Sequence, residues 1–299
     1  MGKPRLTLMV GLPASGKSTY ARILGNADNT TVLSSDILRK ELLGSEADQS
    51  NNDLIFKTLY ERARELLKDG KNVVIDATNI NAKDRRRTLS NFSDLHIEKF
   101  CHVMSTPIET CIERDKKRDR TVGESVIKKF LYRFEIPMYF EGFDEISILQ
   151  YAEKDKWTTR EELFDLMKGF KQDNPHHRFT LDKHCEETAK FVEKHTMDKY
   201  LIEIAKLHDI GKLLTKSFDD DGVAHYYSHH NAGAYMLMSA QLFVPFTLHQ
   251  IFYVNYHMNP FMWKEEKTKL KYLRLLGFEL YNKLMLLHEC DKLASNEEA

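Results

Sequence analysis

The sequence predicts a parallel α/β sheet with flanking helices, followed by an all-α domain. Short apolar strands alternate with helical segments as far as about residue 150, which is typical of a parallel sheet. From Thr158 onward the pattern is helical almost to the end, and two of the 13 histidines precede residue 150. We expect domains at 1–150 and 175–299, with a helical linker at 151–174.

Five apolar runs in the first domain predict strands, because each is short and is bounded by glycine, proline or polar residues. They are Leu6–Val10, Thr31–Ser34, Asn72–Asp76, Glu98–Met104 and Ile146–Leu149. Helices are expected from about Ser18, over 52–68, which Asp69-Gly70 ends, and from Pro107, a proline in a first turn.

The second domain is expected to be helical throughout. Its first helix begins at Thr159-Arg-Glu-Glu162, which has a capping-box pattern, and Asp173-Asn-Pro175 interrupts the chain. The remaining helices are predicted at 182–197, 199–208, 229–242, 246–257 and 267–294.

The composition excludes several protein classes. Of 299 residues, 42% are hydrophobic and 30% charged, which argues against disorder across the whole chain. A net charge of -1 excludes a generic basic nucleic-acid coat but not a local basic cleft. The four cysteines form no Cys-x-x-Cys pair, so neither a disulfide framework nor a zinc ribbon is expected. Without an apolar run of about 18 residues or a signal-peptide core, we expect a cytoplasmic protein with no membrane partner.

A glycine loop follows the first predicted strand. Gly11-Leu-Pro-Ala-Ser-Gly16-Lys17-Ser18 fits G-x-x-x-x-G-K-[ST] and precedes a helix, as a phosphate-binding loop requires. Lys17 would reach the β- and γ-phosphates of a nucleotide and Ser18 would bind Mg²⁺; the alternative is a chance glycine turn. We expect ATP or another NTP to be bound by Gly11, Ser15, Gly16, Lys17, Ser18 and Thr19.

Polar residues after the second and third strands are candidates for an acceptor site. Asp36 could accept the proton of an attacking hydroxyl, and Arg39, one helical turn later, could bind a phosphate. Thr78 and Asn79 are placed for ligand contacts at the end of the third strand. The alternative for Asp36 and Arg39 is an ordinary helix N-cap beside a solvated arginine.

Two basic runs have open interpretations. Arg114-Asp-Lys-Lys-Arg118-Asp-Arg120 could close over the transferring phosphate as an arginine lid, or it could be a solvated charge run. The arginine triplet 85–87 could likewise be a solvated face.

Residues 5–150 resemble the 5′-hydroxyl polynucleotide kinases of the phage end-healing type. The resemblance rests on the phosphate loop, Ser35-Asp36-x-x-Arg39, the Asp76–Asn81 turn and Lys117-Arg118. It implies a P-loop kinase domain in which Asp36 is the general base, Arg39 contacts the acceptor phosphate and Arg118 contacts the donor phosphates. This family often has Asp immediately before the Thr, where this chain has Ala77. We expect Asp76 on the opposite face of the strand, where it would not replace that carboxylate.

The second domain contains a His-Asp pair at the end of an apolar helix. In His208-Asp209-Ile-Gly211-Lys212, Gly211 is expected to turn the chain so that both side chains reach one metal ion. Further ligands must come from other helices, and His184, His229, His257 and Asp291 are the candidates. Imidazole and carboxylate ligands suit Mn, Fe, Co, Ni or Zn better than Ca.

The ordered set His184, His208-Asp209 and Asp291 resembles the HD phosphohydrolase superfamily, over about residues 175–294. His208-Asp-x-Gly-Lys212 and the lead-in from His177 to His184 carry the resemblance. It implies an HD-type helical domain in which His229 is an additional ligand or phosphate contact, with His230 the less favoured neighbour. His257 could complete a second metal site or be a packing histidine, and Lys212 could contact phosphate. The remaining histidines are expected to be structural or on the surface: His176, His195, His225, His249 and His288.

Together these patterns predict a bifunctional enzyme that heals nucleic-acid ends. One domain would phosphorylate a 5′-hydroxyl, and the other would remove a 2′,3′-cyclic phosphate or 3′-phosphate with the help of a metal ion. RNA or DNA ends would be the substrates, and a ligase could act downstream. Two alternatives stay open: a small-molecule kinase fused to a nucleotide phosphohydrolase, and a nucleotide-sensing regulatory protein.

Overall fold

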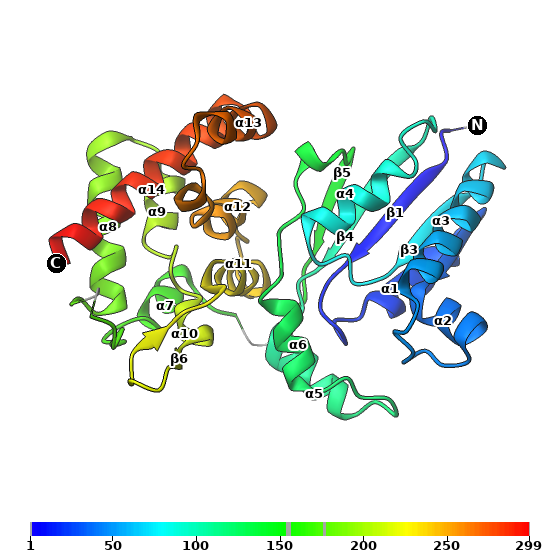
Figure 1. Cartoon of the computed structure of the whole chain (residues 1–299), viewed down its shortest axis with the longest axis horizontal. Helices are drawn as coiled ribbons and strands as arrows, with labels where there is room; N and C mark the ends of the chain where they lie inside the picture. The colour runs from blue at the N-terminus through cyan, green and yellow to red at the C-terminus, as the bar shows by residue number, and fades with distance from the viewer. Residues whose placement is uncertain (1, 154–156, 176–177, 299) are drawn as a thin grey trace. The chain divides into compact units, whose positions relative to one another are not determined.

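A computed structural model describes residues 2–153, 157–175 and 178–298 (Figure 1). The chain divides into two compact units, one made of Met1–Phe130 and Pro137–Tyr151, the other of Leu131–Ile136 and Ala152–Ala299. The activities expected of these parts of the chain stay predictions. Among the described helices, none combines the length and the apolar character needed to span a membrane.

The first unit is built on a five-stranded parallel sheet with the strand order β2-β3-β1-β4-β5. All five predicted strands are confirmed, with bounds β1 Arg5–Val10, β2 Thr30–Ser34, β3 Asn72–Asp76, β4 Glu98–Met104 and β5 Glu145–Leu149. The order reverses at β1, which pairs with β3 on one side and β4 on the other. In open parallel sheets, ligands bind beyond the carboxyl ends of the strands at such a reversal. The loop after β1 therefore occupies the position where a ligand is expected.

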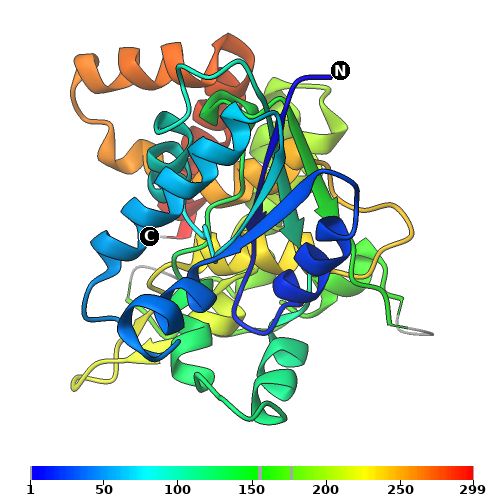
Figure 2. The ribbon, with the colours of Figure 1, turned by 90° about the vertical axis from the view of Figure 1, so that its right-hand side faces the viewer.

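Helices cover both faces of this sheet, as Figure 2 shows for α1 and α3. On one face, Ala21 of α1 packs in a cluster with Met9 of β1 and Val74 of β3. The helices of this unit are α1 Lys17–Gly25, α2 Ser35–Leu43, α3 Asn52–Lys68, α4 Ala82–Ser90, α5 Ile108–Lys116, α6 Glu124–Leu131 and a 3-10 turn, Tyr139–Glu141. Helices α2, α4 and α6 were not expected. Helix α4 was missed because a charged residue, Arg85, lies on its buried face, where a helical sequence pattern would have an apolar residue.

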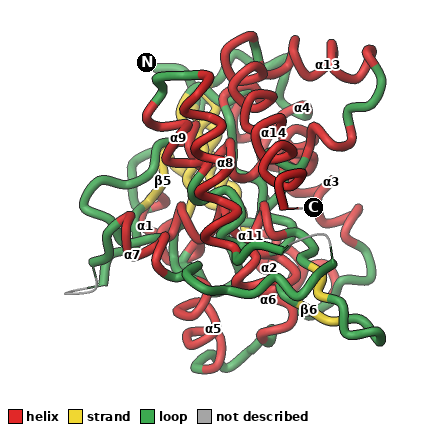
Figure 3. The backbone as a smooth tube through the Cα atoms, turned by 90° about the vertical axis from the view of Figure 1, so that its left-hand side faces the viewer, coloured by secondary structure: helices red, strands yellow, loops and turns green. Residues whose placement is uncertain are grey.

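The second unit is mostly helical, and Figure 3 shows its long helices α8 and α14 side by side. Its elements are α7 Arg160–Asp165, α8 Leu181–His195, α9 Lys199–Ala205, α10 Lys212–Thr215, β6 Ser217–Phe218, β7 Ala224–His225, α11 His229–Ser239, α12 Leu248–Tyr256, a 3-10 turn Asn259–Met262, α13 Glu266–Leu276 and α14 Phe278–Glu298. The predicted single helix over 267–294 is wrong. Gly277 has a φ of 79°, which ends α13 and separates it from α14. The β6–β7 hairpin was not expected either.

A buried ion pair fixes the turn that follows β3. The guanidinium of Arg85 donates to both carboxylate oxygens of Glu141, at 2.8 and 2.7 Å, and also to the carbonyl of Asn79 at 3.0 Å. Both charged side chains are fully buried. Asn79 itself has a φ of 45°, and its side chain donates to the carbonyl of Met9 at the end of β1. The ion pair therefore supports the junction between the ends of β1 and β3.

We predict that Glu141→Gln destabilises the first unit by about 3–5 kcal/mol, because the Arg85 charge would stay buried without its counterion. Hydrogen exchange of the β1 and β4 amides in the full chain measures this loss. The matched control is Asp94→Asn, which removes the carboxylate of the exposed pair with Arg64 and should have a much smaller effect. Equal effects of the two substitutions would show that the buried pair has no special role.

Candidate functional site

The loop between β1 and α1 has the backbone that a phosphate site requires. Gly16 lies in the left-handed region with a φ of 97°, where a side chain would be strained. Lys17, the first residue of α1, is buried and donates from Nζ to the carbonyl of Leu12 at 2.6 Å. Burial lowers the pKa of Lys17 to about 8, against the opposing effect of Asp76. The ammonium therefore lies inside the loop, where an anionic ligand would stabilise its charge and raise that pKa.

A cavity of about 670 Å³ opens beside this loop. Its lining joins the loop residues from Ser15 to Thr19 with apolar side chains such as Leu149 and with Tyr151, over which the Arg114 guanidinium lies at 5.0 Å. This combination suits a nucleotide, because the phosphates need the loop and the base needs an apolar or aromatic surface. Tyr151 was missed in the sequence, although its position just after β5 places it at the carboxyl edge of the sheet.

A second cavity of about 750 Å³ contains the predicted acceptor residues. Lys17, Ser18 and Arg118 line both cavities, so the two hollows meet at the predicted phosphate and lid residues. Asp36 and Arg39 lie on the other side of this cavity, where the Arg39 guanidinium donates to Asp36 at 2.6 Å.

Arg39 is held in place by a residue that the sequence did not reveal. Its guanidinium also donates to Asn52 Oδ1, at 3.1 Å, from the first residue of α3. The Arg39 side chain is 8% exposed, and its Nε is buried without a hydrogen-bond partner among the described residues. A buried, orphaned guanidinium nitrogen fits an anion such as a phosphate.

Two expectations about the end of β3 are wrong. Asp76 was expected on the opposite face of the strand, but it lines the same cavity as Ala77 and Thr78, because β3 ends there and the chain turns. Asn79 was expected to contact a ligand, but it is buried and donates to the Met9 carbonyl instead. The acceptor cavity therefore gains a carboxylate from Asp76 and loses an amide.

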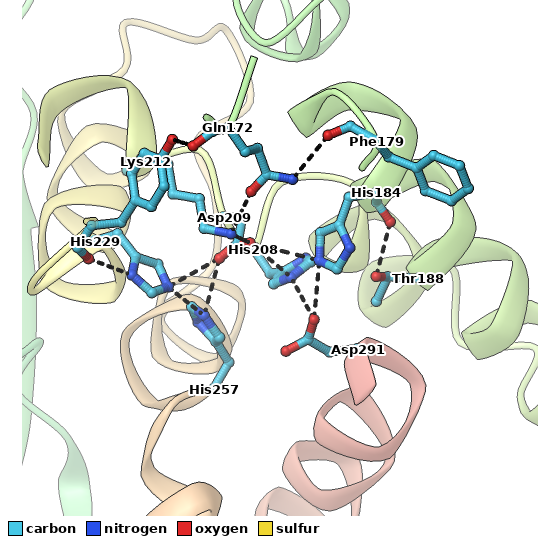
Figure 4. Close-up of polar contacts among 12 residues, drawn as sticks. Gln172, Phe179, His184, Thr188, His208, Asp209, Lys212, His229, His257 and Asp291 are labelled. Carbon is cyan, nitrogen blue, oxygen red and sulfur yellow. Dashed lines mark hydrogen bonds and ion pairs between the residues drawn. The ribbon is translucent and has the colours of Figure 1, made fainter. Parts of the chain in front are cut away.

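The predicted metal ligands of the second unit converge from five segments (Figure 4). They form two groups in which the ligand atoms lie within 4.8 Å of one another: His184, His208 and Asp291, and Asp209, His229 and His257. Asp209 lies between the groups. Its Oδ1 is 3.0 Å from His229 Nε2 and 3.4 Å from His257 Nε2, and its Oδ2 is 3.7 Å from His184 Nε2.

The imidazoles are oriented as metal ligands usually are. The Nδ1 atoms of His208, His229 and His257 each lie 2.7–2.8 Å from a backbone carbonyl, which fixes the proton on Nδ1 and turns the Nε2 lone pair inward. His208 Nε2 is buried without a hydrogen-bond partner among the described residues. These observations and the mixed nitrogen and oxygen donor set fit a divalent transition metal.

Lys212 and Gln172 complete the surroundings of Asp209. Lys212 Nζ lies 2.6 Å from Asp209 Oδ2 and donates to Gln172 Oε1 at 2.8 Å, while the Gln172 amide nitrogen donates to the Phe179 carbonyl. Burial alone would raise the pKa of Asp209, but Lys212 and His208 outweigh it and hold that pKa well below its ordinary value. Gln172 lies outside every motif in the sequence and was missed.

The described histidines that were not expected to bind a metal lie outside the two ligand groups. His230, the less favoured neighbour of His229, belongs to neither group. His225 is paired with Asp219, and the His288 ring packs against Phe261. His176 and His177 lie outside the described residues.

Gly211 has a steric role rather than the turning role expected from the sequence. Its φ is -65°, which any residue adopts, but an added Cβ would overlap the His229 carbonyl oxygen and lie 2.9 Å from Gly233 Cα. The absence of a side chain at Gly211 therefore lets the His208-Asp209 turn approach the start of α11.

We predict that Gly211→Ala weakens metal binding by about tenfold or more, because it separates Asp209 from His229. Metal content after dialysis, measured by mass spectrometry, checks this. Gly222→Asn, in the β6–β7 turn, is the control, because a Cβ there meets no atom within 4 Å and Asn tolerates the φ of 75°. Full metal occupancy in folded Gly211→Ala protein would contradict the steric role.

Comparisons with known proteins agree with the geometry of the first unit. Residues 6–137 match the family described as AAA domain. The chain is 28% identical over 145 residues to a protein of Autographa californica nuclear polyhedrosis virus named "Putative bifunctional polynucleotide kinase/RNA ligase". This match covers 44% of the chain and 21% of the viral protein, so the chain spans about a fifth of that relative.

Solved structures similar to the chain include a protein of the Pnkp1/Rnl/Hen1 RNA repair complex, with 27% identity, a TM-score of 0.40, and coverage of 44% of this chain and 43% of that one. The APS kinase CysC of Mycobacterium tuberculosis has 20% identity and a TM-score of 0.38, over 51% of this chain and 92% of that one. TM-scores below 0.5 support no conclusion about activity. The first unit is a phosphate-loop domain similar in sequence to a polynucleotide kinase/RNA ligase.

Proposed function

We propose that the protein is a bifunctional end-healing enzyme, an ATP-dependent 5′-hydroxyl polynucleotide kinase joined to a metal-dependent 2′,3′-cyclic phosphodiesterase and 3′-phosphatase. The observation that carries the kinase half is the meeting of two cavities at Lys17, Ser18 and Arg118. Phosphoryl transfer needs a donor and an acceptor in line, so adjoining cavities with cationic residues between them suit it.

In the kinase reaction, Lys17 would bind the donor phosphates and Arg118 would stabilise charge on the transferring group. Arg39 would bind the acceptor phosphate, and Asp36, 55% exposed and hydrogen-bonded to Arg39, would accept the proton of the attacking hydroxyl. Mg²⁺ held by Ser18 would neutralise charge on the β- and γ-phosphates.

In the second reaction, Asp209 and the five candidate ligands around it would hold one or two divalent transition metal ions. Such an ion lowers the pKa of bound water toward ~7 and polarises a phosphoryl oxygen. The imidazoles would keep their Nε2 atoms toward the metal because their Nδ1 atoms are engaged by backbone carbonyls. Lys212, which lies 2.6 Å from Asp209 Oδ2, would bind the phosphate of the substrate.

We predict that the protein transfers labelled γ-phosphate from ATP to a 5′-hydroxyl oligonucleotide, and that Asp36→Asn lowers the rate by ~10²–10⁴-fold through loss of the base. Nucleotide affinity should stay near normal, because Asp36 does not line the nucleotide cavity. Asp28→Asn, outside both cavities, is the control.

Transfer to nucleosides in preference to oligonucleotides would instead favour the small-molecule kinase. Nucleotide binding with no transfer to any acceptor would favour the regulatory alternative.

We predict that Asp291→Ala lowers metal content and removes hydrolysis of a 2′,3′-cyclic nucleotide, because its carboxylate is 3.0 Å from His184 Nε2 and 3.5 Å from His208 Nε2. Chelator-stripped wild type should recover activity with Mn, Co or Ni better than with Ca. The control is Glu289→Ala, an exposed carboxylate on the same helix. Unchanged metal content and hydrolysis in the Asp291→Ala protein would remove Asp291 from the site.

A further inference from the structure

A third cavity, of about 360 Å³, lies in the first unit between α3 and α4. These helices are held side by side by a hydrogen bond between Tyr60 and Thr88, at 2.9 Å, and by Arg64, which donates to the Asn91 carbonyl at 2.8 Å. No residue expected from the sequence to bind a ligand lines this cavity, which we call the α3–α4 groove. The proposed function gives it no role.

The groove adjoins the acceptor cavity. Phe56 of α3 lines both hollows, so its ring separates the acceptor residues on one side from the groove on the other. Asn52, which holds Arg39, lies one turn before Phe56 on the same helix. A ligand longer than the acceptor cavity would therefore reach the groove by passing Phe56.

The lining combines aromatic rings with cations. The Phe56 and Tyr60 rings are both partly exposed and lie 6.0 Å apart, and the Tyr60 hydroxyl is held by Thr88. Three cations line the groove: Lys57 and Arg87, whose side chains are 74% and 59% exposed, and Arg64, which is paired with Asp94 outside the lining. Stacking surfaces interleaved with basic residues are what single-stranded nucleic acids require of a protein.

The carboxylates of the groove do not neutralise these cations. Glu61 of the lining lies 4.0 Å from Lys57, and Asp84, outside the lining, lies 3.7 Å from Arg87, both in exposed pairs worth little. Asp53, the other carboxylate of the lining, is exposed at the start of α3. Lys57 and Arg87 can therefore turn to phosphates at small cost.

We propose that the α3–α4 groove binds the nucleotides that follow the 5′ nucleotide of a single-stranded polynucleotide, with bases against Phe56 and Tyr60 and phosphates near Lys57 and Arg87. This inference rests on the proposed kinase function of the adjoining cavity and deepens it. The groove would make the enzyme prefer a strand over a single nucleotide as acceptor.

The test compares the double variant Lys57→Ala/Arg87→Ala with the matched control Lys68→Ala/Arg86→Ala in the full chain. The control removes the same charges from exposed positions of the same two helices, outside the groove. The first readout is the affinity for a labelled 5′-hydroxyl hexanucleotide, measured by fluorescence anisotropy at several salt concentrations. The second is the KM for that strand and for a 3′-nucleoside monophosphate as phosphate acceptors.

The groove variant should bind the strand about tenfold more weakly, and the slope of its salt dependence should fall by about 0.7 for each phosphate that the removed cations had neutralised. Its KM should rise for the strand only, because neither residue lines the acceptor cavity. The control should behave as wild type. Equal losses of affinity in both variants, no loss in either, or an equal rise in KM for the mononucleotide would overturn the proposal.

Failure of the kinase function is distinguishable, because strand binding is measured without phosphoryl transfer. A groove-specific loss of strand binding without any transfer would retain the groove as a strand site and reject the kinase. Transfer to both acceptors with identical KM values in all variants would retain the kinase and reject the groove.

Discussion

Burial of charged side chains that need an oppositely charged partner is the constraint on which both units depend. A buried ion without its counterion costs several kcal/mol, so each such group fixes the position of the segment that supplies its partner. Arg85 and Glu141 do this beside β3, and Asp209 does it with histidines of α8, of α11 and at the end of α12. The buried charges that most need a counterion therefore lie close to the two candidate sites.

The two sites use this constraint differently. In the first unit, the partners of Lys17 and Arg39 are few, and Arg39 keeps an orphaned nitrogen, so the site is short of anions. In the second unit, Asp209 and Asp291 are surrounded by imidazoles whose Nε2 atoms face inward, so that site suits a cation. In the proposed function, the first site would bind phosphates and the second a metal ion that would in turn attract a phosphate.

The sequence predicted the five strands, the glycine loop and the residues that converge around Asp209, because each is a local pattern or a spacing tied to specific chemistry. It failed where tertiary contacts decide. Arg85 occupies a core position that an apolar pattern would fill, so α4 was missed, and one glycine, Gly277, divides a helix that looked continuous. Gln172 and Asn52 were missed because their roles depend on Lys212 and Arg39, which are distant in sequence.

The central claim is that one chain holds two separate centres, one for each end of a broken strand. The direct measurement uses an oligoribonucleotide with a 5′-hydroxyl and a 2′,3′-cyclic phosphate, treated with ATP, Mg²⁺ and Mn²⁺, and follows both ends. Wild type should modify both ends, Lys17→Ala the 3′ end alone, and Asp209→Ala the 5′ end alone. Loss of both reactions in either folded variant, or an unmodified substrate with wild type, would contradict the account.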